Sequence, residues 1–184
     1  MRIIAGRMKG RKLLTPTNDK IRPTSDRLRE SIFNLLMHGS YGGEHIIDRR
    51  VMDLCCGTGA LGFEALSRGA SECIFVDQDK TSLALAKDNA LHCNVVPSSQ
   101  FILADVARLP TARTPVSLVL MDAPYDRPLT VPAYTSLRSG NWFEPGALFL
   151  IEQSKTSVTE ELTGAEIIDQ RDYGKAQIVI YRVT

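Results

Sequence analysis

The sequence predicts an α/β fold built on a mostly parallel, doubly wound sheet, and three observations support this prediction. Four short apolar runs, at residues 51–54, 73–76, 101–104 and 116–121, are separated by segments long enough for helices. Continuous apolar runs are typical of strands that helices cover on both faces. Each run also ends at or beside an acid. A length of 184 residues favours one domain, spanning 1–184.

The first of these runs leads into a glycine turn. Gly57 and Gly59 allow backbone conformations that other residues avoid, and the helix expected from residue 60 directs its free N–H groups at a ligand. The spacing of these glycines and Gly62, with Asp77 about 20 residues on, also fits a dinucleotide site. Asp53 ahead of the glycines would repel a pyrophosphate. It suits a cationic ligand, which favours S-adenosylmethionine over NAD.

The remaining elements follow from local patterns. Residues 2–4 and 11–14 predict a short β-hairpin within a basic extension covering residues 1–22. Thr24 is the expected N-cap of a helix that ends near Gly39. Asp79 is expected to cap a helix over residues 80–91, and a further helix is expected within 130–139. Residues 147–152 predict a fifth strand, and 166–172 with 177–182 predict an antiparallel pair at one edge.

All four acids should meet at one rim, because ligands of open α/β sheets bind at the carboxyl ends of the strands. Any one of Asp53, Asp77, Asp105 and Asp122 could simply cap a turn or helix. Four converging carboxylates repel one another unless something is bound or water solvates them. A ligand site at this rim is therefore the strongest inference from the pattern itself.

The charge is unevenly distributed. Residues 1–30 hold nine Lys and Arg against three Asp and Glu, a formal charge of +6, whereas the remaining residues carry −5. A basic segment on an acidic body indicates contact with a polyanion such as RNA, although a solvated N-terminus would have the same composition. The candidate phosphate contacts are Arg2, Arg7, Lys9, Arg11, Lys12, Arg22, Arg27 and Arg29.

Composition argues against several other classes of protein. Cys55, Cys56, Cys73 and Cys93 form no CxxC pair, and no His stands at ligand spacing from them, so free thiols are expected and no metal. The N-terminus lacks the apolar run of a signal peptide, and no stretch approaches the ~20 apolar residues of a membrane span. A cytoplasmic protein with no membrane partner is expected.

Asp122-Ala123-Pro124-Tyr125 follows the fourth strand and could bind a planar group. Pro124 forces Ala123 toward an extended backbone, so the Ala123 carbonyl can point into the crevice beside the Asp122 carboxylate. Tyr125 adds a flat ring for stacking. The plainer interpretation is a turn with a half-buried Tyr.

These two motifs together resemble S-adenosylmethionine-dependent amino-methyltransferases, whose second motif is (Asn/Asp)-Pro-Pro-(Tyr/Phe). Further blocks make the resemblance specific: the chain is similar over nearly its whole length to bacterial 16S ribosomal RNA guanine-N2 methyltransferases of the RsmD type. The blocks are MRIIAG at residues 1–6, GRKL at 10–13, RPTSDRLRE at 22–30 and GALGFEALSRGA at 59–70. The resemblance implies a Rossmann-like class I methyltransferase fold.

The resemblance also implies an activity: one methyl group passes from S-adenosylmethionine to the exocyclic N2 amine of a 16S guanine during small-subunit assembly. The resemblance implies that the methionine part of the cofactor contacts Asp53, Gly57 and Gly59. Asp77 holds the ribose hydroxyls and Asp105 meets the adenine amine. The catalytic segment is then residues 122–125. The chain departs from the family at Ala123, where proline is usual, so one restriction on the backbone conformation of this segment is missing.

Three other functions remain open from the sequence. A nicotinamide-dependent oxidoreductase would explain the glycine spacing and Asp77, but no obvious acid–base partner for hydride transfer is present. A non-catalytic RNA-binding module would explain the basic extension and leave the four acids unexplained. An adenine-N6 DNA or RNA methyltransferase would use the same chemistry, and only the N-terminal blocks argue against it.

Overall fold

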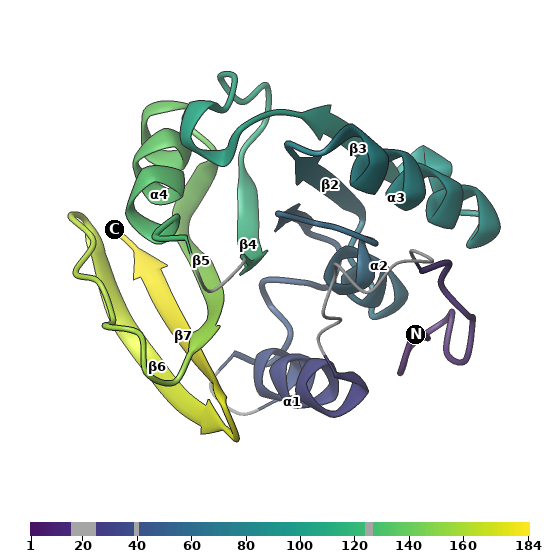
Figure 1. Ribbon diagram of the computed structural model, residues 1–184, viewed down its shortest axis with the longest axis horizontal. Coiled ribbons are helices and arrows are strands. Elements are labelled where there is room, and N and C mark those ends of the chain that lie inside the picture. Colours follow the sequence, from purple (N-terminus) through teal and green to yellow (C-terminus); the bar gives the residue numbers. More distant parts are fainter. Residues whose placement is uncertain (16–24, 39–40, 124–126) are drawn as a thin grey trace.

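The computed structural model describes residues 1–15, 25–38, 41–123 and 127–184. They form one seven-stranded sheet in the order β3-β2-β1-β4-β5-β7-β6 (Figure 1). The strands are β1 (Arg50–Leu54), β2 (Glu72–Asp77), β3 (Ser99–Leu103), β4 (Val116–Asp122), β5 (Phe143–Ser154), β6 (Ala165–Tyr173) and β7 (Ala176–Val183).

The first five strands are parallel, and the C-terminal pair is antiparallel. β7 inserts between β5 and β6 and runs opposite to both. Because β7 reverses the direction of β5 and β6 reverses it again, β6 ends at the same edge of the sheet as β4 and β5. The predicted α/β class, with a mostly parallel sheet and an antiparallel C-terminal pair, is confirmed.

Helices cover both faces of the sheet. Helices α1 (Asp26–Met37), α2 (Ala60–Ser67) and α3 (Lys80–His92) pack on one face, where their apolar side chains join one core cluster. Helix α4 (Thr130–Ser139) packs on the other face, against a second cluster. The 3₁₀ helices η1 (Val96–Ser98) and η2 (Val106–Arg108) flank β3. The helices expected at residues 80–91 and within 130–139 are thus confirmed.

The basic N-terminal segment folds back on itself as expected, with less regular strand structure than a hairpin usually has. A single antiparallel bridge joins Arg2 to Lys12, and Ile3 N–H donates to the Arg11 carbonyl at 2.9 Å. The segment is held to α2 by Glu64, whose buried carboxylate accepts N–H bonds from Ile4 at 2.8 Å and Ala5 at 3.1 Å. The segment therefore depends on the body of the domain for its conformation.

Two expectations about the first helix need correction. Ser25 is the N-cap, because its side-chain oxygen accepts the Leu28 N–H at 3.2 Å; Thr24 lies outside the described residues. Arg29 is not a phosphate contact, because it is fully buried. Its Nη2 donates to the Arg2 carbonyl at 2.8 Å and to the Asp26 carboxylate at 2.7 Å, so this arginine joins the N-terminal segment to α1.

No helix among the described residues is long and apolar enough to cross a lipid bilayer.

Candidate functional site

The strand register brings three of the four acids together on one face of the sheet. Asp53 pairs with Phe75 of β2 and with Leu120 of β4. Asp77 and Asp122 each lie two residues beyond those partners, so their side chains point to the same face as the Asp53 side chain, one step nearer the rim. Asp53 itself lies inside β1, and Leu54 is the last residue of that strand.

Asp53 is the deepest of these acids and is only 2% exposed. Its Oδ2 accepts the N–H of Gly62 at 2.8 Å, which fixes the carboxylate beneath the first turn of α2. Burial holds the pKa of Asp53 well above its usual range; the Gly62 N–H opposes that rise, while Asp122 and Asp77 add to it. A cation bound beside Asp53 would relieve both the burial penalty and the repulsion.

The glycines of the turn have different roles. Gly57 has φ +52°, and a Cβ added there would meet no atom within 4 Å, so its main chain borders open space. Gly59, at φ +80°, would place a Cβ 2.5 Å from the Phe63 ring. A Cβ at Gly62 would lie 2.4 Å from the Phe75 ring. Gly59 and Gly62 thus permit close packing, and Gly57 is the glycine that a ligand can approach.

Two further carboxylates of the rim, those of Asp77 and Asp105, accept hydrogen bonds from backbone N–H groups. Asp77 accepts the Gly57 N–H at 2.9 Å with Oδ2 and the Asp79 N–H at 2.9 Å with Oδ1. Asp105 is exposed, lies two residues beyond β3 and caps η2 by accepting the Ala107 N–H at 3.0 Å. Asp105 therefore has the capping role that the sequence left open, and it also lies at the outer edge of the rim.

All four acids act electrostatically on Cys55. This half-buried residue follows β1 in a left-handed conformation, with φ +61°. Its pKa is raised to about 12, mainly by burial and further by Asp77, Asp53, Asp122 and Asp105 in decreasing order. One thiol thus lies within the electrostatic influence of every acid that the sequence predicted at this rim.

The catalytic segment is described in part. Asp122 is the last residue of β4, is partly exposed and pairs with Glu152 of β5. Ala123 is partly buried against the core cluster below α4. Pro124 and Tyr125 lie outside the described residues, so the expected stacking position of the Tyr ring stays a prediction.

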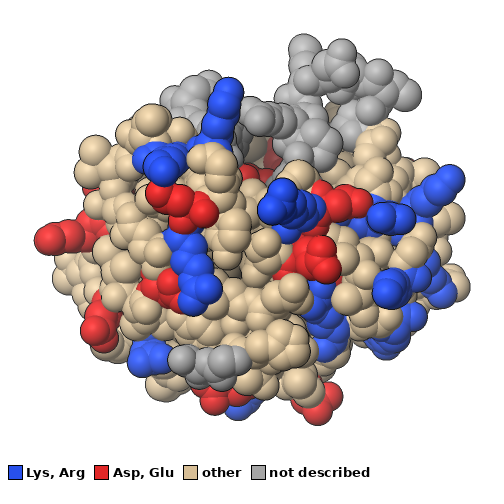
Figure 2. All heavy atoms as spheres, turned by 90° about the horizontal axis from the view of Figure 1, so that it is seen from below, with Lys and Arg blue, Asp and Glu red and all other residues tan. Residues whose placement is uncertain are grey.

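The basic residues of the N-terminal segment lie on the surface. Figure 2 shows Lys and Arg side chains gathered at the end of the molecule that carries this segment. Arg7, Lys9 and Lys12 are exposed. Arg2 is exposed and forms an ion pair with Asp26 at 3.4 Å, and Arg11 Nη1 donates to the Cys93 carbonyl at 2.7 Å.

Arg22 and Arg27 were also expected to contact RNA. Arg27 is exposed on α1. Arg22 lies outside the described residues. Neither residue tests the RNA-binding prediction.

The residues of this rim fit an organic cation. No group of three or more His, Cys, Asp or Glu among the described residues could hold a metal ion. All four cysteines are free, as expected. A buried carboxylate, an open glycine N-terminal to α2 and two backbone-fixed acids fit the ammonium, sulfonium and ribose hydroxyl groups of S-adenosylmethionine.

Sequence reasoning missed the residue that ties the glycine turn to the N-terminal segment. Asn89 of α3 is fully buried. Its Nδ2 donates to the carbonyls of Thr58 at 3.0 Å and Leu14 at 3.1 Å, while its Oδ1 accepts the Leu14 N–H at 2.7 Å. The only local signal was a polar residue one position before Ala90 on the apolar side of a predicted helix.

Comparison with known proteins places the chain among methyltransferases of ribosomal RNA. Residues 1–182 match the family model described as "Conserved hypothetical protein 95". A Haemophilus influenzae protein named "Ribosomal RNA small subunit methyltransferase D" is 35% identical over 162 residues, covering 84% of this chain and 79% of that protein. "Putative rRNA methyltransferase YlbH" of Bacillus subtilis is 30% identical over 187 residues, covering 99% of this chain and 98% of that protein.

A solved structure agrees. "Putative methyltransferase yhhF from Escherichia coli" superposes with a TM-score of 0.83 at 27% identity, covering 100% of this chain and 97% of that chain.

Proposed function

The chain belongs to the family described as conserved hypothetical protein 95, that of the RsmD-type ribosomal RNA methyltransferases, and we propose that it methylates the exocyclic N2 amine of a guanine in 16S ribosomal RNA with S-adenosylmethionine as methyl donor. The family supports a methyltransferase acting on small-subunit RNA. The donor and the guanine N2 atom are the parts of the proposal that rest on the site.

One observation carries the proposal for the donor: the buried Asp53 carboxylate lies on the same face of the sheet as Asp77 and Asp122, beside a glycine turn that opens on free space. When bound, S-adenosylmethionine supplies an activated methyl group on a positively charged sulfur. Asp53 and the Gly57 turn would hold its aminoacyl part. Asp77 would accept bonds from the ribose hydroxyls, and Asp105 would accept from the adenine amine.

Asp122 and Ala123 would hold the methyl acceptor. Asp122 ends β4 on the same face as Asp53, so a base bound there lies next to the donor site. A guanine presents N1–H and N2–H as an adjacent pair of donors, which the Asp122 carboxylate and the Ala123 carbonyl can accept together. Holding the amine in line with the methyl group lowers the entropic part of the barrier.

Electrostatics adds to this positioning. The amine becomes positively charged as it is methylated, and the Asp122 carboxylate stabilises that charge before accepting the released proton. Tyr125 is proposed to stack on the face of the base that has been turned out of the RNA. The exposed Arg7, Lys9 and Lys12 are proposed to contact RNA phosphates, together with the other basic residues predicted from the sequence.

Mass spectrometry of nucleosides tests this function directly. 16S RNA and small subunits from cells that lack this protein are incubated with the purified protein and methyl-labelled S-adenosylmethionine. The expected product is one N2-methylguanosine per 16S RNA, formed by the native protein and lost in Asp122→Ala. N6-methyladenosine would instead assign the adenine-specific alternative, and comparison of free RNA with subunits identifies the substrate, including an assembly intermediate.

A further inference from the structure

A hollow lies between α1 and the C-terminal strands, and none of the four rim acids lines it. Its volume is about 800 Å³, within the roughly 300–1,000 Å³ of small-ligand pockets. Helix α1 and the residue that follows it contribute Ser31, Asn34, Leu35 and His38, which share one side of the helix by their spacing. The facing wall comes from β6 and β7. We call this hollow the α1–β6 groove.

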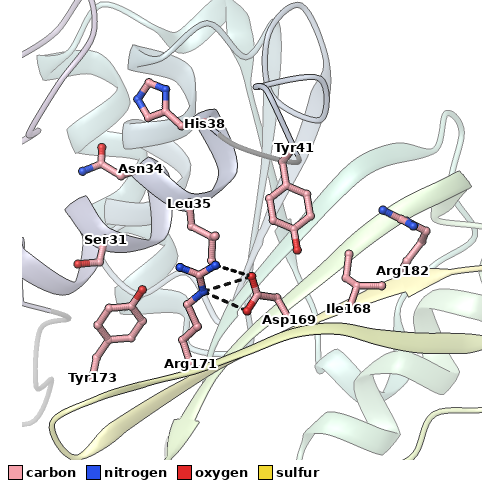
Figure 3. Close-up of a pocket in the computed structure, with 10 residues that line it drawn as sticks. All are labelled: Ser31, Asn34, Leu35, His38, Tyr41, Ile168, Asp169, Arg171, Tyr173 and Arg182. Carbon is pink, nitrogen blue, oxygen red and sulfur yellow. Dashed lines mark hydrogen bonds and ion pairs between the residues drawn. The ribbon is translucent and has the colours of Figure 1, made fainter.

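The α1–β6 groove combines aromatic rings with guanidinium groups. Figure 3 shows Tyr173 at one end and Tyr41 with Arg182 at the other, with Arg171 and Asp169 between them. An aromatic ring offers a base a stacking surface, and a guanidinium group offers a phosphate a fixed charge. The set of side chains therefore matches the two parts of a nucleotide.

Arg171 is held in place within the α1–β6 groove. Its Nε donates to Asp169 Oδ1 at 3.0 Å and its Nη2 to Asp169 Oδ2 at 3.0 Å. Figure 3 shows the third nitrogen of the guanidinium directed away from Asp169. The charge of Asp169 is thereby balanced by Arg171. Arg182 forms no ion pair with a described residue, so the groove has a net positive charge.

Tyr41 is a buried polar side chain that points into the α1–β6 groove. The residue is 6% exposed, and its hydroxyl forms no hydrogen bond with any described residue. Burial raises the pKa of this phenol, with a further contribution from Asp169, so the hydroxyl stays a neutral donor. This hydroxyl can therefore donate a hydrogen bond to a base or to a phosphate oxygen in the groove.

The strand register links the α1–β6 groove to the catalytic segment. Asp122 pairs with Glu152 on β5, Glu152 with Ile178 on β7, and Ile178 with Arg171 on β6. Paired residues point to the same face of a sheet, so Asp122 and Arg171 share a face, three strand spacings or about 14 Å apart. A short length of single-stranded RNA can therefore reach from one to the other.

We propose that the α1–β6 groove binds a short single-stranded RNA segment that flanks the target guanine, with one base against Tyr173 and successive phosphates at Arg171 and Arg182. The inference rests on the proposed function for the identity of the RNA. The groove thereby selects the RNA strands that can place a guanine beside Asp122. It increases the affinity for RNA and makes no contact with the methyl donor.

Arg182→Ala and Tyr173→Ala test this proposal, with Arg113→Ala as a charge-matched control from the exposed loop before β4. The probes are free 16S RNA and small subunits from cells that lack the protein. Each groove variant is expected to raise Kd and KM for both probes about tenfold, the scale of one stacked base or one anchored phosphate. The kcat and the affinity for S-adenosylmethionine should stay unchanged. Tyr173→Phe and Arg182→Lys should restore most of the RNA affinity, which a merely structural defect would not predict.

Several results overturn the inference. Native Kd and KM in both alanine variants would do so. So would a loss seen with subunits alone, because that outcome assigns the α1–β6 groove to a ribosomal protein. If the native protein shows no methyl transfer but the groove variants still weaken binding to free RNA, the inference holds and the proposed function fails. Thermal melting of each variant identifies those that are unfolded, and the two conservative variants then decide the result.

Discussion

Two groups of charges of opposite sign lie on one face of the sheet. The acidic half is the rim at β3, β2, β1 and β4, where Asp53, Asp77 and Asp122 share this face and Asp105 lies just beyond β3. The basic half is the α1–β6 groove, where Arg171 and Arg182 outnumber Asp169 and where Arg171 lies in the same row as Asp122. The comparison teaches how one face of a sheet can serve two ligands of opposite charge: the acidic half suits a cationic donor, and the basic half suits a polyanionic acceptor.

The largest loss of methyl-transfer rate is expected when Asp122 is substituted. Asp122→Asn removes the carboxylate and keeps the shape, so methyl transfer should slow by about 10²–10³-fold, the typical cost of losing one group that stabilises transition-state charge. Single-turnover methylation of 16S RNA measures the rate. Cofactor affinity should change less than twofold in calorimetry, and an unchanged rate would remove Asp122 from the mechanism.

Asp53→Asn should weaken binding of the methyl donor without affecting binding of RNA. Losing a hydrogen bond to a charged group costs about 1.5–3 kcal/mol of binding free energy. S-adenosylmethionine binding should therefore weaken roughly 10- to 100-fold, which calorimetry measures. RNA affinity should be unaffected. The amide oxygen of the substituted side chain can still accept the Gly62 N–H, so the fold is retained.

The same substitution should change the pH dependence of stability. Since the pKa of Asp53 is raised in the folded state, the ligand-free protein binds more protons folded than unfolded above the ordinary Asp pKa near 3.8. Its free energy of unfolding should therefore fall as the pH rises through that range toward the folded-state pKa. Urea titrations at several pH values should show this fall in the native protein and a flatter profile in Asp53→Asn. Parallel profiles would contradict the burial argument.

The glycines of the turn should separate stability from ligand binding. Gly62→Ala places a Cβ against Phe75 and should destabilise the fold by about 1–3 kcal/mol through overpacking. Gly57→Ala meets no neighbouring atom and should cost only about 1–2 kcal/mol of left-handed strain. The added methyl group at residue 57 should nevertheless obstruct the cofactor. Urea denaturation and calorimetry on both variants measure the two quantities, and equal cofactor affinities would contradict the assignment.

The smallest effect is expected at the N-terminal basic surface. Lys9→Ala and Lys12→Ala should each weaken RNA binding a few-fold and reduce the slope of log K against log salt by about 0.7, the value for one phosphate contact on single-stranded nucleic acid. Binding of labelled 16S RNA over a series of salt concentrations measures the slope. An equal loss of cofactor affinity would instead indicate that this segment supports folding.

The sequence predicted much of the acidic half, because its signals are local. An apolar run, an acid, a glycine turn and a helix are consecutive in the chain, and the carboxyl ends of parallel strands must share an edge. The positions of Asp53, Asp77, Asp105 and Asp122 were therefore predicted, and the register places Asp53, Asp77 and Asp122 on one face of the sheet. Family membership was also predicted from local blocks and is confirmed by the comparisons.

The basic half was not predicted, because its contacts join segments far apart in the chain. The same limit applies outside this half: no local pattern shows that Arg29 of α1 donates to the Arg2 carbonyl, so its periodicity wrongly suggested an outward-facing cation. Likewise, the antiparallel pair was predicted without its order, and only the insertion of β7 beside β5 places Arg171 in the row of Asp122.

The sequence by itself thus determined the class of fold, the family and the row of acids at the strand ends, since strand period, turn chemistry and strand polarity act over neighbouring residues. Tertiary structure alone decided which charges are buried and which remain at the surface. It also decided that α1 faces β6 across a hollow lined by Tyr41 and Tyr173. The physical reason is that burial and groove shape depend on packing between residues from opposite ends of the chain, where local periodicity carries no information.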